Sequence, residues 1–303
     1  MSVLRAFKAL SATEGVSVAS DVALASCTTY RIGGPADIVA VANTYAGLVA
    51  LFRVLEAEQV PWVILGRGSN VLAADAGYRG CVVRLGSEFD RIQVEGTTIS
   101  SGAAVQLARL VNKSLSEELS GLECCAGIPG TVGGALSMDA GSRHEWIGRA
   151  VRDVVTYRPG VGMHRYLASE IEWGYRWTTI PSNEIILEAT FELTSSTKSA
   201  VAGEMNRRLA RRRATQPTGK PCCGSVFKNP GDRSVGALLE GCSLKGYRVG
   251  QAVVSERHAN FVVNEGGARA VDVLAVINHM HGQVKQRYGV DLTPEVKFLG
   301  FEG

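Results

Sequence analysis

Hydrophobic residues recur with helical spacing in several parts of the chain. Because residues three or four apart lie on one face of a helix, this spacing predicts amphipathic helices. The segments with this pattern are 3–10, 48–55, 105–119, 235–240 and 269–287. A further helix, rich in arginine, is predicted to end at Arg213.

Short apolar or alternating runs between these helices predict β-strands. They lie at residues 22–24, 36–41, 62–65, 92–102, 151–157, 185–193 and 261–263. The mixture of strands and helices predicts an α+β fold. The polar stretch 194–199 is the best candidate for a domain boundary. We expect three parts, residues 1–86, 87–197 and 198–303.

Two loops concentrate the glycines, of which the chain has 35 among 303 residues. The first, GRGSNVL, begins at Gly66 directly after a predicted strand, and the second, GIPGTVGG, begins at Gly127. Glycine permits positive φ and leaves backbone amides free to converge on an anion, so both loops suit a pyrophosphate. Neither has the spacing G-x-G-x-x-G of a dinucleotide fingerprint, and neither is a P-loop.

Composition narrows the class of protein. Hydrophobic residues make up 46% and charged residues 20%, which is typical of a packed globular protein. A net charge of +3 is too small and too dispersed to indicate nucleic-acid binding. The seven cysteines include two adjacent pairs but no C-x-x-C spacing, so we expect reduced thiols and no metal site. With no apolar leader segment and no membrane-length apolar window, we expect a cytoplasmic protein without membrane contact.

Three polar features have a structural as well as a chemical interpretation. Ser225, in GSVFKNP, is more often a turn residue than a catalytic one, and it lacks the G-x-S-x-G context of a hydrolase nucleophile. The arginine run at 207–213 is more often a solvated helix face, although Arg213 is a candidate for a substrate diphosphate. A single histidine such as His258 more often has a structural role.

Seven segments occur together in one order and carry a resemblance. They are TYRIGGPA at Thr29, GRGSNVL at Gly66, AGIPGTVGG at Ala126, Tyr175-Arg176, GSVFKNP at Gly224, SERHANFVVN at Ser255 and TPEV at Thr293. On these segments the chain resembles the UDP-N-acetylenolpyruvoylglucosamine reductase family, and more closely its shorter type, from Thr28 to Gly300. Seven matches in one order are highly specific.

The resemblance implies a two-subdomain FAD-binding fold of the vanillyl-alcohol-oxidase type, followed by a C-terminal substrate-binding domain. It implies FAD as cofactor, NADPH as co-substrate and the enolpyruvyl ether of UDP-N-acetylglucosamine as substrate. We also expect a monomer. The implied cofactor-binding residues are Arg31, Gly33, Gly66, Arg67, Gly68, Ser69, Asn70, Val71, Leu72, Gly127, Ile128, Pro129, Gly130, Thr131, Gly133, Gly134, Asp139, Ala140 and Gly141. The implied substrate-binding residues are Tyr175, Arg213, Lys228, Asn229 and His258.

The resemblance also implies that Ser225 is the proton donor and that Arg176 and Glu295 polarise the substrate. A fixed guanidinium suits Arg176, because negative charge develops on the enolpyruvyl group as it accepts hydride. A serine hydroxyl is a weak acid, so Ser225 is expected to depend on neighbours such as Lys228. Without the resemblance, Glu295 would be interpreted as a surface carboxylate.

The chain departs from the family pattern at a few positions. Asp139 stands where the family usually carries Asn, and its extra negative charge is expected to shift the flavin potential. Cys222 and Cys223 stand where small residues without sulfur are more usual, and Cys223 is expected to react with thiol reagents. Cys242 and Ser243 replace another small pair.

Three alternatives remain open on the sequence. Another flavoprotein of the same fold, such as an alcohol or sugar oxidase, would lack the set of Ser225, Arg176 and Glu295. A hydrolase using Ser225 would contain no flavin. A nucleotide-sugar or polyanion-binding module resting on the arginine run would show steep salt dependence and no turnover.

Overall fold

The computed structural model describes residues 2–301. The chain divides into two compact units. Unit 1 consists of Met1–Ser20, Ile38–Gly66 and Gly80–Arg211, and unit 2 of Asp21–Asp37, Arg67–Arg79 and Arg212–Gly303. Each unit mixes helices with strands, which confirms the α+β class. The expected boundaries at residues 86 and 197 stay a prediction.

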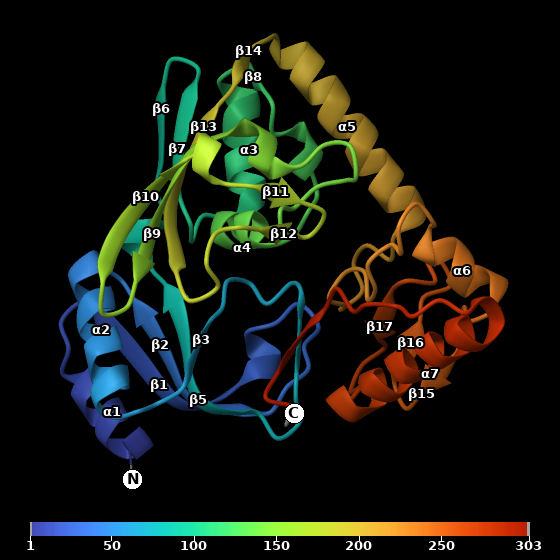
Figure 1. The fold of residues 1–303 in the computed structure, drawn as a ribbon, viewed down its shortest axis with the longest axis horizontal. Helices are drawn as coiled ribbons and strands as arrows, with labels where there is room; N and C mark the ends of the chain where they lie inside the picture. The colour runs from blue at the N-terminus through green and yellow to red at the C-terminus, as the bar shows by residue number, and fades with distance from the viewer. Residues whose placement is uncertain (1, 302–303) are drawn as a thin grey trace. The chain divides into compact units, whose positions relative to one another are not determined.

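A four-stranded sheet begins unit 1. Its strand order is β1 (Val16–Ala23), β2 (Pro35–Ala42), β5 (Tyr78–Leu85) and β3 (Trp62–Ile64), with β3 parallel to β5. Helices α1 (Ser2–Ser11) and α2 (Tyr45–Ala57) lie beside this sheet (Figure 1). Ile38, Ala40 and Ala42 alternate along β2 and share one buried core with Leu48 and Leu51 of α2. The period of two in the strand and the apolar stripe of the helix therefore produce this layer.

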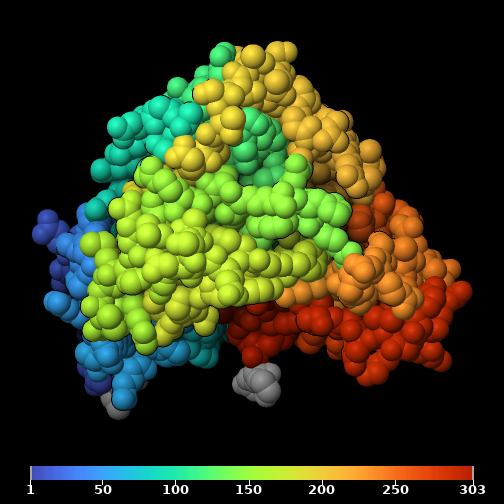
Figure 2. Space-filling model, turned by 45° about the horizontal axis from the view of Figure 1, so that its top comes forward, coloured from blue at the N-terminus to red at the C-terminus, as the bar shows by residue number. Residues whose placement is uncertain are grey.

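A five-stranded antiparallel sheet forms the rest of unit 1. Its order is β10 (Gly162–Leu167), β9 (Val151–Arg158), β13 (Ile185–Glu192), β7 (Thr98–Gly102) and β6 (Ile92–Glu95). Leu110 of helix α3 (Leu107–Ser116) and Leu136 of helix α4 (Val132–Ser137) share one buried core with Phe191 of β13. The edge strand β10 is largely exposed, and the residues of the β9–β10 hairpin contribute to the yellow-green surface in Figure 2.

Shorter elements complete unit 1. Two-residue strands pair as β8 (Leu119–Ser120) with β14 (Thr194–Ser195) and as β11 (Trp173–Gly174) with β12 (Trp177–Thr178). Helix α5 (Lys198–Thr215) begins in unit 1, and its last four residues belong to unit 2. The 3₁₀ turns of the chain are η1 (Leu24–Ser26), η2 (Ser87–Phe89), η3 (Glu123–Cys125), η4 (Ile147–Ala150) and η5 (Ala168–Glu170).

Unit 2 is built around helix α7 (Ala270–Tyr288). The helix packs on a three-stranded antiparallel sheet, β15 (Arg248–Val249), β16 (Ala252–Val254) and β17 (Val262–Asn264), and on helix α6 (Val235–Gly241). The carboxylate of Asp75 accepts hydrogen bonds from the amides of Ala270 and Val271, at 2.7 and 3.0 Å, and so caps the start of α7. Strand β4 (Val71–Ala73) pairs in parallel with β18 (Lys297–Leu299).

The predicted helices are confirmed within about three residues at each end. The strand predicted at 22–24 is wrong in its extent, because residues 22 and 23 end β1 and Leu24 opens a 3₁₀ turn. The sequence did not predict the short helix α4 or ten of the strands, namely β4, β5, β8, β10, β11, β12, β14, β15, β16 and β18. Among residues 2–301, no helix is both long and apolar enough to cross a membrane.

Candidate active site

The second glycine loop lies in unit 1, between η3 and α4. Gly127 and Gly130 have φ of 75° and 137°, conformations that side chains rarely adopt. Thr131 caps α4, since its Oγ1 accepts a hydrogen bond from the Gly134 amide at 3.3 Å. A Cβ on Gly66 would lie 2.5 Å from Thr131 Oγ1. The first residue of one predicted loop therefore lies directly against the other loop.

The remainder of the first glycine loop lies in unit 2. Gly68 has φ of 60°, and a Cβ there would lie 2.6 Å from the Cys27 carbonyl oxygen. Gly33 has φ of 129°, and its Cβ would lie 2.6 Å from that of Ala73. The Thr29 amide donates to the Gly68 carbonyl at 3.3 Å. The turn that carries Arg31 and Gly33 is thus packed on residues 68–73. The resemblance assigns both segments to the same cofactor.

Ser225 and Glu295 are brought together in unit 2 by backbone hydrogen bonds. The Glu295 amide donates to the Val226 carbonyl at 2.7 Å, and the Lys228 amide donates to the Thr293 carbonyl at 2.9 Å. Asn70, in the first glycine loop, donates from Nδ2 to the Glu295 carbonyl at 3.0 Å. The glycine loop, the Ser225 segment and the Glu295 segment are therefore three adjacent pieces of chain.

Asn260 is a residue of this site that the sequence did not single out. It is 2% exposed, its Oδ1 accepts from the Phe227 amide at 3.0 Å, and its Nδ2 donates to the Phe227 carbonyl at 2.9 Å. The Asn260 carbonyl also accepts from the Val226 amide at 2.9 Å. The side chain therefore acts as a strand partner for Phe227, and the backbone carbonyl pairs with Val226, the residue directly after Ser225. Its place in SERHANFVVN was the available signal.

The other predicted residues of unit 2 are partly occupied with structural contacts. His258 Nδ1 accepts from the Asn260 amide at 3.2 Å, and burial lowers the pKa of His258, which favours the neutral ring. Asn229 Oδ1 accepts from the Val235 amide at 3.0 Å, at the start of α6. Arg213 is exposed, and its carbonyl accepts from the Arg257 guanidinium at 2.7 Å. Their substrate-binding roles stay predictions.

Arg176 and Tyr175 form the two-residue turn of the β11–β12 hairpin in unit 1. Arg176 has φ of 65°, and its guanidinium lies 5.0 Å from the centre of the Tyr175 ring. The same guanidinium donates to the Gly141 carbonyl at 3.4 Å. Arg176 thus contacts Gly141, in the segment 139–141 that the resemblance assigns to the cofactor.

Comparisons with known proteins agree on one family. Residues 36–158 match a family model described as an FAD binding domain, and residues 216–299 match one described as the C-terminal domain of UDP-N-acetylenolpyruvoylglucosamine reductase. A UDP-N-acetylenolpyruvoylglucosamine reductase from Bacillus subtilis is 36% identical over 281 residues, covering 91% of this chain and 92% of the relative. One from Symbiobacterium thermophilum is 42% identical over 275 residues, covering 90% and 89%.

A solved structure gives the same result. The crystal structure of UDP-N-acetylenolpyruvylglucosamine reductase from Thermus caldophilus has 34% sequence identity and a TM-score of 0.82, covering 94% of this chain and 98% of that one. The chain belongs to the UDP-N-acetylenolpyruvoylglucosamine reductase family. The expected flavin-binding fold is confirmed, and the protein is an FAD-dependent oxidoreductase. The individual residue roles stay predictions.

The glycine loop of unit 1 fits the pyrophosphate of FAD in this reductase. Within residues 2–301, no group accepts a hydrogen bond from the backbone amides of Gly127, Gly130 or Thr131. Donors that are unused and exposed by glycine conformations are what a pyrophosphate needs. A side chain at Gly66 would meet Thr131, so the approach of the two loops requires glycine there.

Asp139 is a buried acid of unit 1. It is 3% exposed, and its Oδ1 accepts from the Gly148 amide at 3.2 Å. Burial raises the pKa of Asp139 from 3.8 to about 6, against the opposing effects of the Gly148 amide and the Arg176 guanidinium. Burial of the ionised carboxylate at neutral pH therefore lowers the stability of the folded protein.

Replacement of Asp139 by asparagine is expected to raise the free energy of unfolding at neutral pH by about 1–2 kcal/mol, after allowance for partial solvent screening. Because the pKa is raised in the folded state, the stability contributed by Asp139 is fully present below its unfolded pKa of 3.8 and is lost as the pH rises through about 6. Urea unfolding of both proteins at about pH 4 and about pH 7.5 tests this. A difference that does not grow with pH would contradict it.

Cys223 is a correction to the sequence analysis. Its side chain is 2% exposed and packs in the core of unit 2, where burial raises the pKa of the thiol well above its usual value. A buried, protonated thiol does not react readily. The expectation that Cys223 reacts with thiol reagents is therefore wrong.

Proposed function

We propose that this protein reduces the enolpyruvyl group of UDP-N-acetylglucosamine enolpyruvate to give UDP-N-acetylmuramate, with NADPH as the source of electrons. The reaction would serve peptidoglycan precursor synthesis. The supporting observation is sequence identity of 35–42% over about 91% of the chain to relatives that carry the name of this reductase. The motifs around Ser225, Arg176 and Glu295 are part of the same similarity.

The proposal gives each cofactor-binding residue a task. The amides of the loop at Gly127 would bind the pyrophosphate. Positive φ at Gly127 and Gly130 keeps side chains away from the bound group. FAD, when bound, supplies the hydride that it has received from NADPH.

The chain's own groups would then handle charge and protons. Hydride added to the methylene carbon leaves negative charge on the neighbouring carbon and its carboxylate, and a guanidinium such as that of Arg176 stabilises this charge. The hydroxyl of Ser225 would donate the proton that completes the C–H bond on the neighbouring carbon. Glu295 is bonded through its backbone to Val226, the residue after Ser225, so its segment holds the proton donor in place. Transfer of one hydride and one proton balances the reduction.

The remaining assignments belong to the same proposal. Tyr175, Arg213, Lys228, Asn229 and His258 would bind the sugar nucleotide. The three-part division at residues 86 and 197, a cytoplasmic location and a monomer are likewise proposed.

Anaerobic titration of the FAD-loaded protein tests the proposed function. NADPH is expected to bleach the flavin absorbance more efficiently than NADH, and the enolpyruvyl sugar nucleotide is then expected to restore it with formation of UDP-N-acetylmuramate, detected by mass spectrometry. Recovery of absorbance with oxygen but not with that substrate would instead indicate an oxidase. A colourless protein that fails to take up FAD would contradict the proposal entirely.

A further inference from the structure

A polar cavity of about 430 Å³ lies within unit 1, apart from the glycine loops. It is bounded by the β8 and β14 strands, by η3 and by one face of α5. Two arginines and four glutamates dominate its lining, and one cysteine thiol reaches it: Arg149, Arg208, Glu123, Glu145, Glu192, Glu204 and Cys124. Nothing in the proposed reductase mechanism uses these groups.

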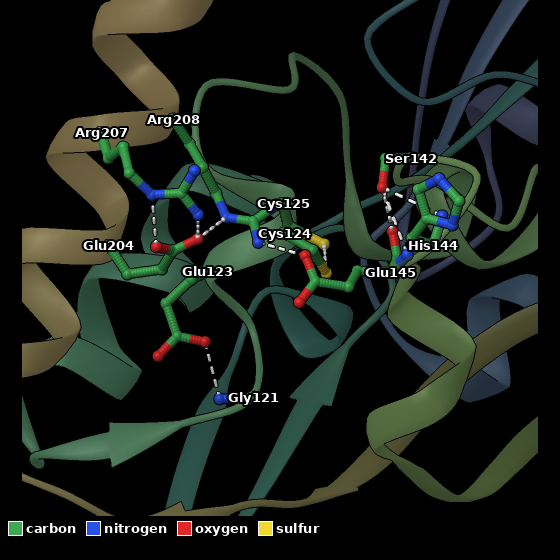
Figure 3. A network of polar contacts seen from close by, with 10 residues as sticks. All are labelled: Gly121, Glu123, Cys124, Cys125, Ser142, His144, Glu145, Glu204, Arg207 and Arg208. Carbon is green, nitrogen blue, oxygen red and sulfur yellow. Dashed lines mark hydrogen bonds and ion pairs between the residues drawn. The ribbon is translucent and has the colours of Figure 1, made fainter.

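The thiol at the cavity belongs to a pair. Cys124 is half-buried and lines the cavity, whereas Cys125 is 1% exposed in the core. Their sulfur atoms are 3.7 Å apart (Figure 3). The contact with Cys125 lowers the pKa of Cys124 against the effect of burial, and the Arg208 guanidinium lowers it further, whereas Glu145 and Glu123 raise it. The same contact together with burial raises the pKa of Cys125. Because Cys124 lines the cavity and Cys125 is enclosed in the core, Cys124 is the sulfur of the pair that a reagent in the cavity can reach.

The cavity offers charges of both signs beside this thiol. The guanidinium of Arg208 pairs with the carboxylates of Glu145 and Glu204. Glu123 is 8% exposed, and its Oε2 accepts from the Gly121 amide at 2.8 Å. The Arg149 guanidinium lies 4.2 Å from the centre of the Trp146 ring. Carboxylate and ammonium groups of one small ligand would both find partners here.

We propose that Cys124 is a site of reversible S-thiolation by disulfides of small amino-acid-derived thiols, whose charged groups occupy this cavity. The Cys124 thiolate attacks one sulfur of the disulfide. The sulfur–sulfur bond of the reagent breaks, a bond from Cys124 Sγ to the attacked sulfur forms, and the other sulfur leaves as a thiolate that takes up the proton lost by Cys124. The disulfide is thereby the oxidant, and a thiol reverses the step.

The geometry favours retention of the adduct over closure of a Cys124–Cys125 disulfide. Consecutive Cα atoms across a trans peptide are about 3.8 Å apart, below the ~4.4–6.8 Å of ordinary disulfides. The sulfur atoms at 3.7 Å would also have to approach to about 2.05 Å. The small thiol therefore remains attached to Cys124.

The other thiols provide internal comparisons. Cys81, Cys125 and Cys223 are buried, with pKa values raised by their surroundings. Burial also raises the pKa of the half-buried Cys222. Cys27 and Cys242 are half-buried like Cys124, but neither lines the cavity. Selectivity for Cys124 over these two would show the contribution of the cavity.

The test treats the FAD-loaded protein with L-cystine and measures the adduct at each cysteine by acid quenching and peptide mass spectrometry. Cys124 is expected to be modified about tenfold faster than Cys27, Cys222 or Cys242, and dithiothreitol is expected to remove the adduct. Cys124→Ser should abolish this fast reaction, whereas the matched variant Cys242→Ser should retain it. Equal modification of all four half-buried thiols would overturn the proposal.

The role of the cavity is tested with two related reagents. Cystamine carries only the ammonium group, and 3,3′-dithiodipropionate carries only the carboxylate. For each reagent we compare the ratio of its rate at Cys124 to its rate at Cys242. This ratio is expected to be at least about threefold lower for both reagents than for cystine. Equal relative rates for the three reagents would overturn the assignment of the cavity as the binding site. A mass loss of about 2 Da on the peptide, without an adduct, would overturn retention of the small thiol.

Discussion

Replacement of Ser225 by alanine is expected to slow oxidation of the reduced flavin by the enolpyruvyl sugar nucleotide by about 10²–10⁴-fold, the usual contribution of general acid catalysis. Reduction of the flavin by NADPH does not use this proton and should stay within about twofold of the parent rate. Ser225 is half-buried in a segment held by backbone bonds to Asn260 and Glu295, so the loss of one hydroxyl should leave that segment in place. Anaerobic stopped-flow spectroscopy measures the two half-reactions separately.

Two further measurements distinguish loss of the proton from structural damage. Ser225→Cys keeps a group that can donate a proton, and since a thiol is more acidic than a serine hydroxyl, it should recover part of the lost rate. Equal unfolding midpoints for the three proteins would show that the segment is intact. If both half-reactions of Ser225→Ala remained fast, the proton would come from another group and the assignment would be wrong.

The long helices could be predicted because their patterns are local. The apolar stripe of α7, from Val273 to Val284, is buried as expected, and Gly289 ends the helix with φ of 67°. The cap at its other end was not predictable in this way. It comes from Asp75, 195 residues earlier in the chain, and nothing in the sequence near either residue marks that contact.

The shortest strands were missed for a related reason. Strands β4 and β18 have three residues each, too few for a period of two to be visible. Their parallel pairing, Val71 with Lys297 and Leu72 with Phe298, joins segments more than 200 residues apart. This pairing brings the first glycine loop beside Glu295. The sequence supplied the residue types of the site, whereas long-range pairing supplies their proximity.

The glycine loops were the most predictable part of the site, because glycine has a specific backbone meaning. Gly68, Gly127 and Gly130 all have the positive φ that the loop interpretation required. The cysteines were less predictable, since reactivity depends on burial that no local pattern reveals. Cys223 is enclosed, while Cys124 reaches a charged cavity.

Replacement of Asn260 by alanine is expected to lower the free energy of unfolding by about 2–5 kcal/mol, because it leaves the buried amide and carbonyl of Phe227 without partners. The same change should reduce turnover with the enolpyruvyl substrate by more than the loss of folded protein explains, since the segment after Ser225 loses its side-chain support. Urea unfolding gives the first quantity. The rate of flavin reoxidation gives the second, and it is measured without urea at a temperature where both proteins are folded.

Two control variants make the role of Asn260 specific. Asn260→Asp keeps an oxygen to accept from the Phe227 amide but loses the Nδ2 donor to its carbonyl, so its effect should lie between those of the parent and of Asn260→Ala. Asn206 is exposed on α5, and Asn206→Ala should change stability by no more than about 0.5 kcal/mol. Equal stability and equal rates of flavin reoxidation for Asn260→Ala and Asn206→Ala would contradict this prediction. The two bonds to Phe227 would then not position Ser225, and the backbone bond from Glu295 to Val226 would be sufficient to hold the segment.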